Sequence, residues 1–384
     1  MGAYLSSPVV TKETFDGSGL NLRYGGGAMQ GWRKTMEDAH IAVTELDKDP
    51  NTCLFAVFDG HGGGEVAKFC QRYMPNEIQE LEEYKSGMLE ESLISVFHRM
   101  DSMLRDAKYS QELQQLAVKE VLEEDETDNQ GDGNSMDPFE MLKRVLQLKR
   151  YLPGETTESR AEAAAEAAAA GTSEASEQPP EQLVQAGCTA VVALKKGSDL
   201  YVANAGDSRG VLCRDGMAIA LSEDHKPAQQ IERERIIRAG GFVSDIGGVT
   251  RVNGNLNLSR AIGDLKYKGN TSLPPKDQII SAHPDVMKIS LLPQDQFFVL
   301  ACDGVWDVMT NQQVVDFVKE RLDKGMIPKE ISCELLDACL ATDPKEARGI
   351  GCDNMTIVIV QLDSHNAVPT TSKPQLVSQL QAKQ

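Results

Sequence analysis

The chain has 384 residues with a formal net charge of −19, from 39 basic and 58 acidic residues. This length allows one large domain or two smaller ones. The acidic balance makes nucleic acid a poor partner and a basic partner or substrate an easier one. Residues 105–186 alone contribute −10, with 8 basic and 18 acidic residues. Eight scattered cysteines without a C-x-x-C pair indicate reduced thiols in an intracellular protein. We expect it in the cytoplasm, the nucleus or both.

The amino terminus matches the N-myristoylation pattern, with Gly2 after Met1 and a serine at Ser6. The alternative is a chance match, because Gly after Met and a later Ser are common. A single acyl chain binds membranes only marginally, and residues 1–21 offer one basic residue, Lys12, and no cysteine as a second anchor. We therefore expect at most transient membrane contact through Gly2. The sequence contains no run of about 18 apolar residues and no secretory signal.

Hydrophobic periodicity predicts short strands and amphipathic helices along the chain. Residues 1–21 are polar without a period and are expected to form an extended amino-terminal arm. A glycine-rich entry at Gly25 leads into two short strands with a turn near Arg33. Pro227 suits the first turn of a helix, and Gly240 can stop it. The other predicted elements, in chain order, are a strand over 53–59, helices over 65–81, 87–104, 110–122 and 138–152, strands over 190–194, 200–205, 210–213 and 217–221, a helix over 227–239, an irregular stretch over 242–283, a strand over 296–302, helices over 311–324 and 329–340, and a strand over 355–362.

The composition changes over residues 105–186, which contain acidic, polar and alanine-rich low-complexity pieces. We interpret this segment as an insertion within one domain over 22–363, because the strand pattern resumes directly after it. Residues 128–133 resemble the start of an EF-hand loop, but Phe139 stands where a bidentate Glu is needed, so a solvated acidic loop is preferred. Residues 364–384 are polar and are expected to form a disordered tail.

Carboxylates stand at the ends of several predicted strands. The apolar run 54–58 leads directly into Asp59, and a histidine and several glycines follow before a helical pattern begins. If the strands share one sheet system, five or six carboxylates meet at one rim and repel one another. Hard cations such as Mg²⁺ or Mn²⁺ resolve this repulsion because they prefer oxygen ligands, whereas no His/Cys set has the spacing of a zinc site. For any single Asp the alternative is a turn or cap residue. The carboxylates at such positions are Glu37, Asp38, Asp59, Asp207, Asp303 and Asp353.

Seven short motifs follow one another along the chain. They are WRKTMEDAH (32–40), FDGHGG (58–63), ANAGDSR (203–209), DHKP (224–227), LSRAIGD (258–264), ACDGVWDV (301–308) and DNMT (353–356). Together they strongly resemble the PP2C family of metal-dependent protein serine/threonine phosphatases. The resemblance covers about residues 22–362 apart from the insertion, and the amino-terminal sequence and the acidic insertion are most similar to the gamma-type branch.

The resemblance implies an α+β fold in which two antiparallel β-sheets pack as a central sandwich with helices on both outer sides. It implies hydrolysis of phosphoserine and phosphothreonine on proteins. The nucleophile implied by the resemblance would be a hydroxide that two Mn²⁺ or Mg²⁺ ions activate for in-line attack on phosphorus. We expect a monomer whose partners are its phosphoprotein substrates.

The resemblance also assigns roles to individual residues. Asp59 would bridge two metal ions, with Asp303 and Asp353 completing one site and Glu37 and the Gly60 carbonyl completing the other. Asp38 would hold metal-bound water, and Asp207 and Asp307, with Asp303, would form a weaker third metal site. Arg33 would bind the substrate phosphate through a bidentate fork, and His61 would protonate the departing oxygen. The alternative for His61 is a helix-start or turn residue, and His98, His225, His283 and His365 are interpreted as structural or surface residues.

Other functions fit parts of the sequence. Residues 61–64 resemble an esterase oxyanion loop and residues 206–210 fit G-x-S-x-G. A serine hydrolase needs a strand–elbow–helix at Ser208, whereas residues 210–221 predict two strands, so the context fails. A non-catalytic binding protein of the same fold would have lost a ligand, yet every metal and phosphate position is present. Cysteine-based phosphatase chemistry is excluded, because no Cys is followed by Arg six positions later.

Overall fold

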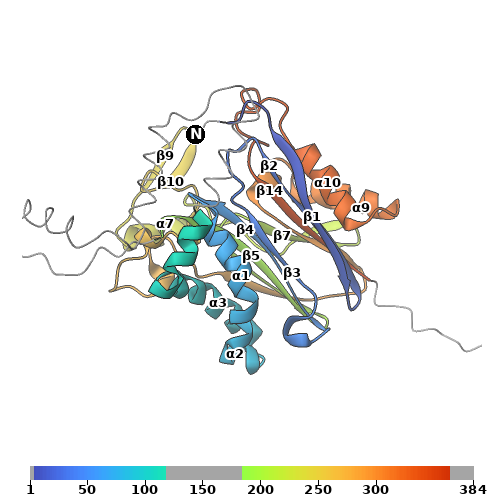
Figure 1. Cartoon of the computed structure of the whole chain (residues 1–384), viewed down its shortest axis with the longest axis horizontal. Helices are drawn as coiled ribbons and strands as arrows, with labels where there is room; N and C mark the ends of the chain where they lie inside the picture. The colour runs from blue at the N-terminus through green and yellow to red at the C-terminus, as the bar shows by residue number, and fades with distance from the viewer. Residues whose placement is uncertain (1–3, 118–183, 364–384) are drawn as a thin grey trace, which may run out of the picture.

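The computed structural model describes residues 4–117 and 184–363 and contains two large antiparallel sheets (Figure 1). The first sheet has the order β1 (Val9–Gly19), β2 (Leu22–Gly31), β14 (Met355–Leu362), β13 (Asp295–Ala301), β7 (Arg209–Arg214) and β8 (Met217–Ala220). The second has the order β12 (Asp285–Ser290), β6 (Asp199–Ala205), β5 (Gly187–Lys196), β4 (Thr52–His61) and β3 (Ala39–Val43), and β11 (Ile262–Gly263) also pairs with β5. A separate hairpin joins β9 (Val243–Ile246) and β10 (Val249–Val252).

The core between the two sheets explains why the central strands are apolar at every position. In β4, Phe55 and Val57 belong to a buried cluster with Phe298 of β13 and Val358 of β14. The alternate residues of β4, such as Phe58, pack in a different cluster with the helices. Successive side chains of a strand point to opposite faces, so a strand covered on both faces reads as a continuous hydrophobic run.

Helices cover the outer faces of both sheets (Figure 1). On the second sheet lie α1 (Glu65–Glu80) and α3 (Leu89–Leu104), and on the first lie α9 (Asn311–Asp323) and α10 (Pro328–Cys339). The start of α9 is fixed by a capping box between Thr310 and Gln313. This arrangement is the four-layer α+β sandwich that the sequence predicts. The shorter helices are α2 (Glu82–Lys85), α7 (Gln230–Arg238) and α8 (Asp303–Trp306), with 3-10 turns at Leu46–Lys48, Ala107–Tyr109, Leu265–Tyr267 and Pro275–Asp277.

Two predicted boundaries are wrong. The sequence predicts an arm over residues 1–21, but Val9–Gly19 form β1 and pair along β2 from Val9 to Gly19. An edge strand is bonded on one side only and is half exposed, so polar residues occupy it without a hydrophobic period. The predicted insertion begins at residue 105, yet residues 110–117 are helical and Leu113 is buried against the α1–α3 cluster. The fold therefore extends into both segments.

Several other expectations need adjustment or lie outside the described residues. Helix α7 begins at Gln230 rather than residue 227, and the stretch predicted as irregular contains the β9–β10 hairpin. Strand β12 is a largely exposed edge strand that the sequence pattern does not reveal. No helix among the described residues is long and apolar enough to cross a membrane. Gly2, His365, the EF-hand-like loop, the predicted helix over 138–152 and the predicted tail over 364–384 lie outside the described residues.

Candidate metal centre and catalytic residues

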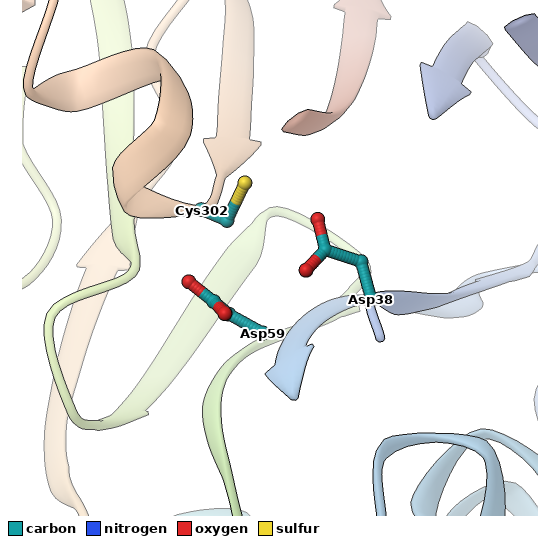
Figure 2. A group of neighbouring side chains, drawn as sticks. All are labelled: Asp38, Asp59 and Cys302. Atoms are coloured by element: carbon teal, nitrogen blue, oxygen red, sulfur yellow. The ribbon is translucent and has the colours of Figure 1, made fainter. Parts of the chain in front are cut away.

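Asp38 and Asp59 form the centre of a polar group with Cys302, in which Asp38 and Cys302 are buried and Asp59 is half-buried. Asp38 immediately precedes β3, Asp59 lies near the end of β4, and Cys302 follows β13, so the group joins both sheets. One possible ligand atom from each residue lies within 4.8 Å of the others. Figure 2 shows both carboxylates directed into the space that they share with the Cys302 side chain. Two of the strand-end carboxylates that the sequence predicts to converge therefore lie together.

Further carboxylates share the electrostatic environment of Asp59. Burial raises the pKa of Asp59 well above its usual value, and the negative charges of Asp303 and Asp38 raise it further. Burial likewise raises the pKa of Asp303, with contributions from Asp207 and Asp353. Neighbouring carboxylates with little access to water repel one another. Such a group is stable only when a bound cation or bound protons offset the negative charge. Asp38, Asp207 and Asp353 raise the pKa of Asp59 or Asp303 through their charges, and Asp307 does so for Asp303, so these carboxylates lie within range of one another's charge.

Asp38 carries an unsatisfied oxygen. Its Oδ2 accepts a hydrogen bond of 2.7 Å from the Thr356 hydroxyl, while its buried Oδ1 finds no hydrogen-bond partner among the described residues. Burial raises the pKa of Asp38 to about 7, against the lowering effect of the Thr356 bond, and nearby Asp353 adds to the rise. A buried carboxylate oxygen without a donor is costly, so this oxygen fits a site that receives a cation or an ordered water.

Cys302 was not among the predicted site residues. Burial raises the pKa of its thiol well above the usual value, and the charges of Asp38 and Asp59 raise it further. Its sulfur accepts a hydrogen bond of 3.1 Å from the Thr356 backbone N–H. A neutral thiol is a poor ligand for hard cations, so the oxygen donors are the ones that fit Mg²⁺ or Mn²⁺.

Glu37 lies against the backbone of Gly60. A Cβ at Gly60 would stand 2.3 Å from the Glu37 carbonyl oxygen, so only glycine allows this approach. The Glu37 carboxylate accepts hydrogen bonds from the Thr35 hydroxyl at 2.8 Å and from the Gly63 N–H at 3.1 Å. Gly63 can point its N–H in this direction because its φ is +131°, which favours glycine. The two predicted ligands of the second metal site are thus neighbours.

Arg33 lies next to the predicted metal ligand Asp353. Its Nη2 donates to Asp353 Oδ2 at 2.5 Å, and about half of the Arg33 side chain is exposed. Partial burial by itself lowers the pKa of Arg33, but the charge of Asp353 and this bond raise it overall. A permanently charged, half-exposed guanidinium beside the carboxylates is suited to bind an anionic group that approaches from solvent.

His61 is paired with Asp264, a residue for which the sequence predicts no role. The distance from His61 Nε2 to Asp264 Oδ2 is 2.6 Å. Burial alone lowers the pKa of His61, but the charge and hydrogen bond of Asp264 raise it overall. Asp264 belongs to the LSRAIGD motif, yet 203 positions separate it from His61, so no spacing pattern connects the two residues.

Lys226 is a second functional neighbour that the sequence does not reveal. Its Nζ forms an ion pair with Asp207, which is only 2% exposed. Burial lowers the pKa of Lys226, but Asp207 raises it overall, so the lysine stays charged. Burial also raises the pKa of Asp307, and the positive charge of Lys226 partly counteracts this rise. A protein cation therefore already lies within the group predicted to hold a third metal.

The surroundings of Ser208 bear on the esterase alternative, and those of His225 bear on its interpretation as a structural residue. Ser208 is fully buried between strands β6 and β7 and shares a hydrogen bond of 2.6 Å with the Thr189 hydroxyl. A strand rather than a helix follows, so the predicted absence of a nucleophile elbow is confirmed. His225 accepts a bond from the Gly206 N–H and contacts Asp285. His98 and His283 contact each other at 3.1 Å.

Comparison with known proteins identifies the family. The family model for Protein phosphatase 2C matches residues 22–119 and 136–347. "Probable protein phosphatase 2C 21" of Arabidopsis thaliana is 42% identical over 376 residues, covering 98% of this chain and 96% of the relative. "Probable protein phosphatase 2C 58" of Oryza sativa subsp. japonica is 41% identical over 361 residues, covering 94% of this chain and 89% of the relative.

Solved structures show the same fold. A phosphatase from a pathogenic strain of Toxoplasma gondii has a TM-score of 0.59 at 21% identity, covering 93% of this chain and 97% of the other. A serine-threonine phosphatase 2C from Toxoplasma gondii has a TM-score of 0.58 at 20% identity, covering 92% of this chain and 100% of the other. The chain belongs to the protein phosphatase 2C family and is a protein phosphatase with an α+β fold.

Proposed function

We propose that the chain removes phosphate from phosphoserine and phosphothreonine on proteins at a centre of two divalent cations, Mn²⁺ or Mg²⁺. The observation that carries this proposal is the group of carboxylates around the half-buried Asp59, with the unsatisfied Oδ1 of the buried Asp38. Its charged donors are all oxygen atoms, which is the ligand set of hard cations. The raised pKa of Asp59 is the expected sign of a site whose charge a cation offsets.

The ligand assignment is the one that the resemblance to the family implies. Asp59 would contact both cations, Asp303 and Asp353 would hold one of them, and Glu37 with the Gly60 carbonyl would hold the other. Bound there, the cations would lower the pKa of water so that a nucleophile exists near neutral pH. Asp38 would orient the attacking water through its free Oδ1. A weaker third cation would lie with Asp207 and Asp307.

The remaining steps belong to side chains of the protein. Arg33 would bind the non-bridging phosphate oxygens with its guanidinium, which presents two parallel N–H groups. The water oxygen forms a bond to phosphorus while the bond to the serine or threonine oxygen breaks. His61 donates its proton to that departing oxygen, and the proton released by the water restores the ring. The products are inorganic phosphate and the free hydroxyl side chain.

Metal-depleted protein tests this function. Protein dialysed against a chelator should hydrolyse a phosphothreonine peptide only after addition of Mn²⁺ or Mg²⁺. Asp59→Asn should abolish turnover, whereas Ser208→Ala should retain appreciable activity because Ser208 lies outside the proposed chemistry. Metal-independent activity, or no activity with either cation, would contradict the proposal. Loss with Ser208→Ala and retention with Asp59→Asn would favour an esterase instead.

We also propose that the protein acts inside the cell, in the cytoplasm or nucleus, with transient membrane contact if Gly2 is acylated. Support comes from the eight cysteines, all of which are free thiols. Imaging of the tagged full-length chain beside a Gly2→Ala variant tests both parts. Secretion would contradict the first part, and identical membrane recovery of the two proteins would contradict the second.

A further inference from the structure

We propose that Asp264 is a positioning residue that orients His61 for protonation of the departing oxygen. This inference rests on the proposed function. His61 Nε2 and Asp264 Oδ2 lie 2.6 Å apart, and Asp264 is 1% exposed. An ionised carboxylate can only accept, so the Nε2–H of His61 is the donor in this contact. The ring orientation is thereby fixed, and Nδ1 is left as the nitrogen from which a proton can reach the substrate.

The backbone around Asp264 is fixed from the sheet side. Asp264 adopts a left-handed conformation with φ of 50°, and its N–H donates to the Ala186 carbonyl at 3.0 Å. Directly before it, β11 pairs with β5, so that Gly263 stands opposite Gly187. Gly187 in turn stands opposite His61 across the β4–β5 ladder. One strand of the central sheet therefore sets the positions of both partners.

Helix α3 fixes the same segment from the other side. Asp101 of α3 accepts the Gly263 N–H at 2.8 Å and binds Lys268 Nζ at 2.6 Å. Lys268 also donates to the Ala261 carbonyl at 2.7 Å. Asp101 thus holds the chain on both flanks of Asp264. A carboxylate that is held this firmly can hold a histidine in one orientation.

Gly187 has no side chain, and this makes room for the contact between His61 and Asp264. A Cβ at Gly187 would lie 2.5 Å from Asp264 Oδ2 and 2.7 Å from His61 Nε2. Both contacts are closer than real Cβ atoms show, so any side chain at this position would push the two groups apart. Gly187 lies beside His61 and Asp264 but is uncharged. A substitution there therefore disturbs their contact while both partners remain present.

The test compares two leaving groups. Proton donation matters for the alkoxide of a phosphothreonine peptide, whereas p-nitrophenolate leaves without help. Asp264→Asn is the main variant, because Asn keeps the shape of Asp and tolerates a left-handed backbone. We expect kcat on the peptide to fall by about 100-fold, within the range of general acid catalysis, and kcat on p-nitrophenyl phosphate to fall by less than about threefold. Gly187→Ala should give the same pattern, and Asp245→Asn in the exposed hairpin is the control.

A double-mutant cycle completes the test. If Asp264 acts through His61, adding Asp264→Asn to His61→Gln should cause no further loss on the peptide. Equal losses on both substrates, additive losses in the cycle, or no loss in either single variant would overturn the proposal. If Asp264→Asn does not fold, Gly187→Ala decides on the same criteria. Failure of the proposed function itself looks different, because the wild-type protein would then show no metal-dependent hydrolysis of either substrate.

Discussion

Arg33 donates a hydrogen bond of 2.5 Å to Asp353, so the residue assigned to substrate phosphate is bonded to a residue assigned to a metal ion. This is the one hydrogen bond that the Arg33 guanidinium makes among the described residues. Its other N–H groups can therefore bind phosphate oxygens while the contact to Asp353 persists. The proposed substrate site and the proposed metal site would therefore be linked by this bond, and a change in either is expected to affect the other.

Replacing Arg33 tests the phosphate contact. Arg33→Lys keeps the charge but removes the bidentate fork, so we expect KM for a phosphothreonine peptide to rise about tenfold. Arg33→Ala should raise it further. Steady-state kinetics with saturating Mn²⁺ measures both effects, and Arg23→Lys, at an exposed position of β2, is the matched control. An unchanged KM in both Arg33 variants would show that this guanidinium does not bind substrate.

Lys226 is predicted to compete with the third cation. Its ammonium neutralises Asp207, so Lys226→Met should leave that carboxylate free and strengthen the weakest Mn²⁺ site by about tenfold. Mn²⁺ titration followed by electron paramagnetic resonance reports this affinity without an activity assay. Lys226→Arg preserves the charge and should bind as the wild type does. Weaker or unchanged Mn²⁺ binding in Lys226→Met would refute the competition.

Gly60 is predicted to accept no side chain. Because a Cβ would stand 2.3 Å from the Glu37 carbonyl, Gly60→Ala must move Glu37 or the end of β4. We expect Mn²⁺ affinity to fall roughly 10- to 100-fold, as for other changes that misplace metal ligands. Gly269→Ala is the control, because a Cβ there meets no atom within 4 Å. Isothermal titration calorimetry should separate the two variants, and equal affinities would remove Gly60 from the site.

A buried ion-pair network beside the site is predicted to stabilise the fold. Glu232 of α7 binds Arg235 at 2.6 Å and Arg260 at 2.8 Å. Glu232→Gln leaves the buried Arg235 without its carboxylate partner and Arg260 with Asp285 alone, so the free energy of unfolding should fall by about 3–5 kcal/mol. Glu234→Gln on the exposed face of the same helix is the control and should change it by less than about 0.5 kcal/mol. Urea denaturation measures both, and equal values would contradict the role of Glu232.

The same network predicts how stability depends on pH. Burial by itself raises the pKa of Glu232, but the hydrogen bond from Arg260 and the charges of both arginines lower it from 4.5 to about 2. The folded state thus binds this proton less readily than the unfolded state. Its stabilisation is complete above pH 4.5 and is lost as the pH falls from there towards 2. The difference between wild type and Glu232→Gln should shrink over this window, and a constant difference would count against the shift.

The sequence predicts the central strands well because both of their faces are buried. The predicted strand over 355–362 coincides with β14 (Met355–Leu362), and the strand over 53–59 is within two residues of β4 (Thr52–His61). The edge strands β1 and β12 escape prediction because exposed edge positions need no hydrophobic side chains. Hydrophobic periodicity in a sequence indicates which side chains are buried. These two strands bury few side chains and are stabilised mainly by backbone hydrogen bonds to one neighbouring strand.

For the site, motifs locate the carboxylates but not their partners. Asp38 and Asp59 are predicted from their places at strand ends, and the structure brings them together. The pairing of Asp264 with His61 depends on β11 joining β5, a contact that no local pattern encodes. The position of Cys302 in the same group is likewise set by the packing of two sheets. Such relationships arise only when distant segments fold against one another.

Counting bound metal tests the central claim most directly. Equilibrium dialysis of the metal-depleted full-length chain against Mn²⁺, followed by elemental analysis, should give two tightly bound ions per chain and a weaker third. Asp59→Asn should lose tight binding, because this carboxylate would contact both ions. A wild-type protein that retains no tightly bound Mn²⁺, or an Asp59→Asn variant that binds as many ions as the wild type, would contradict the account.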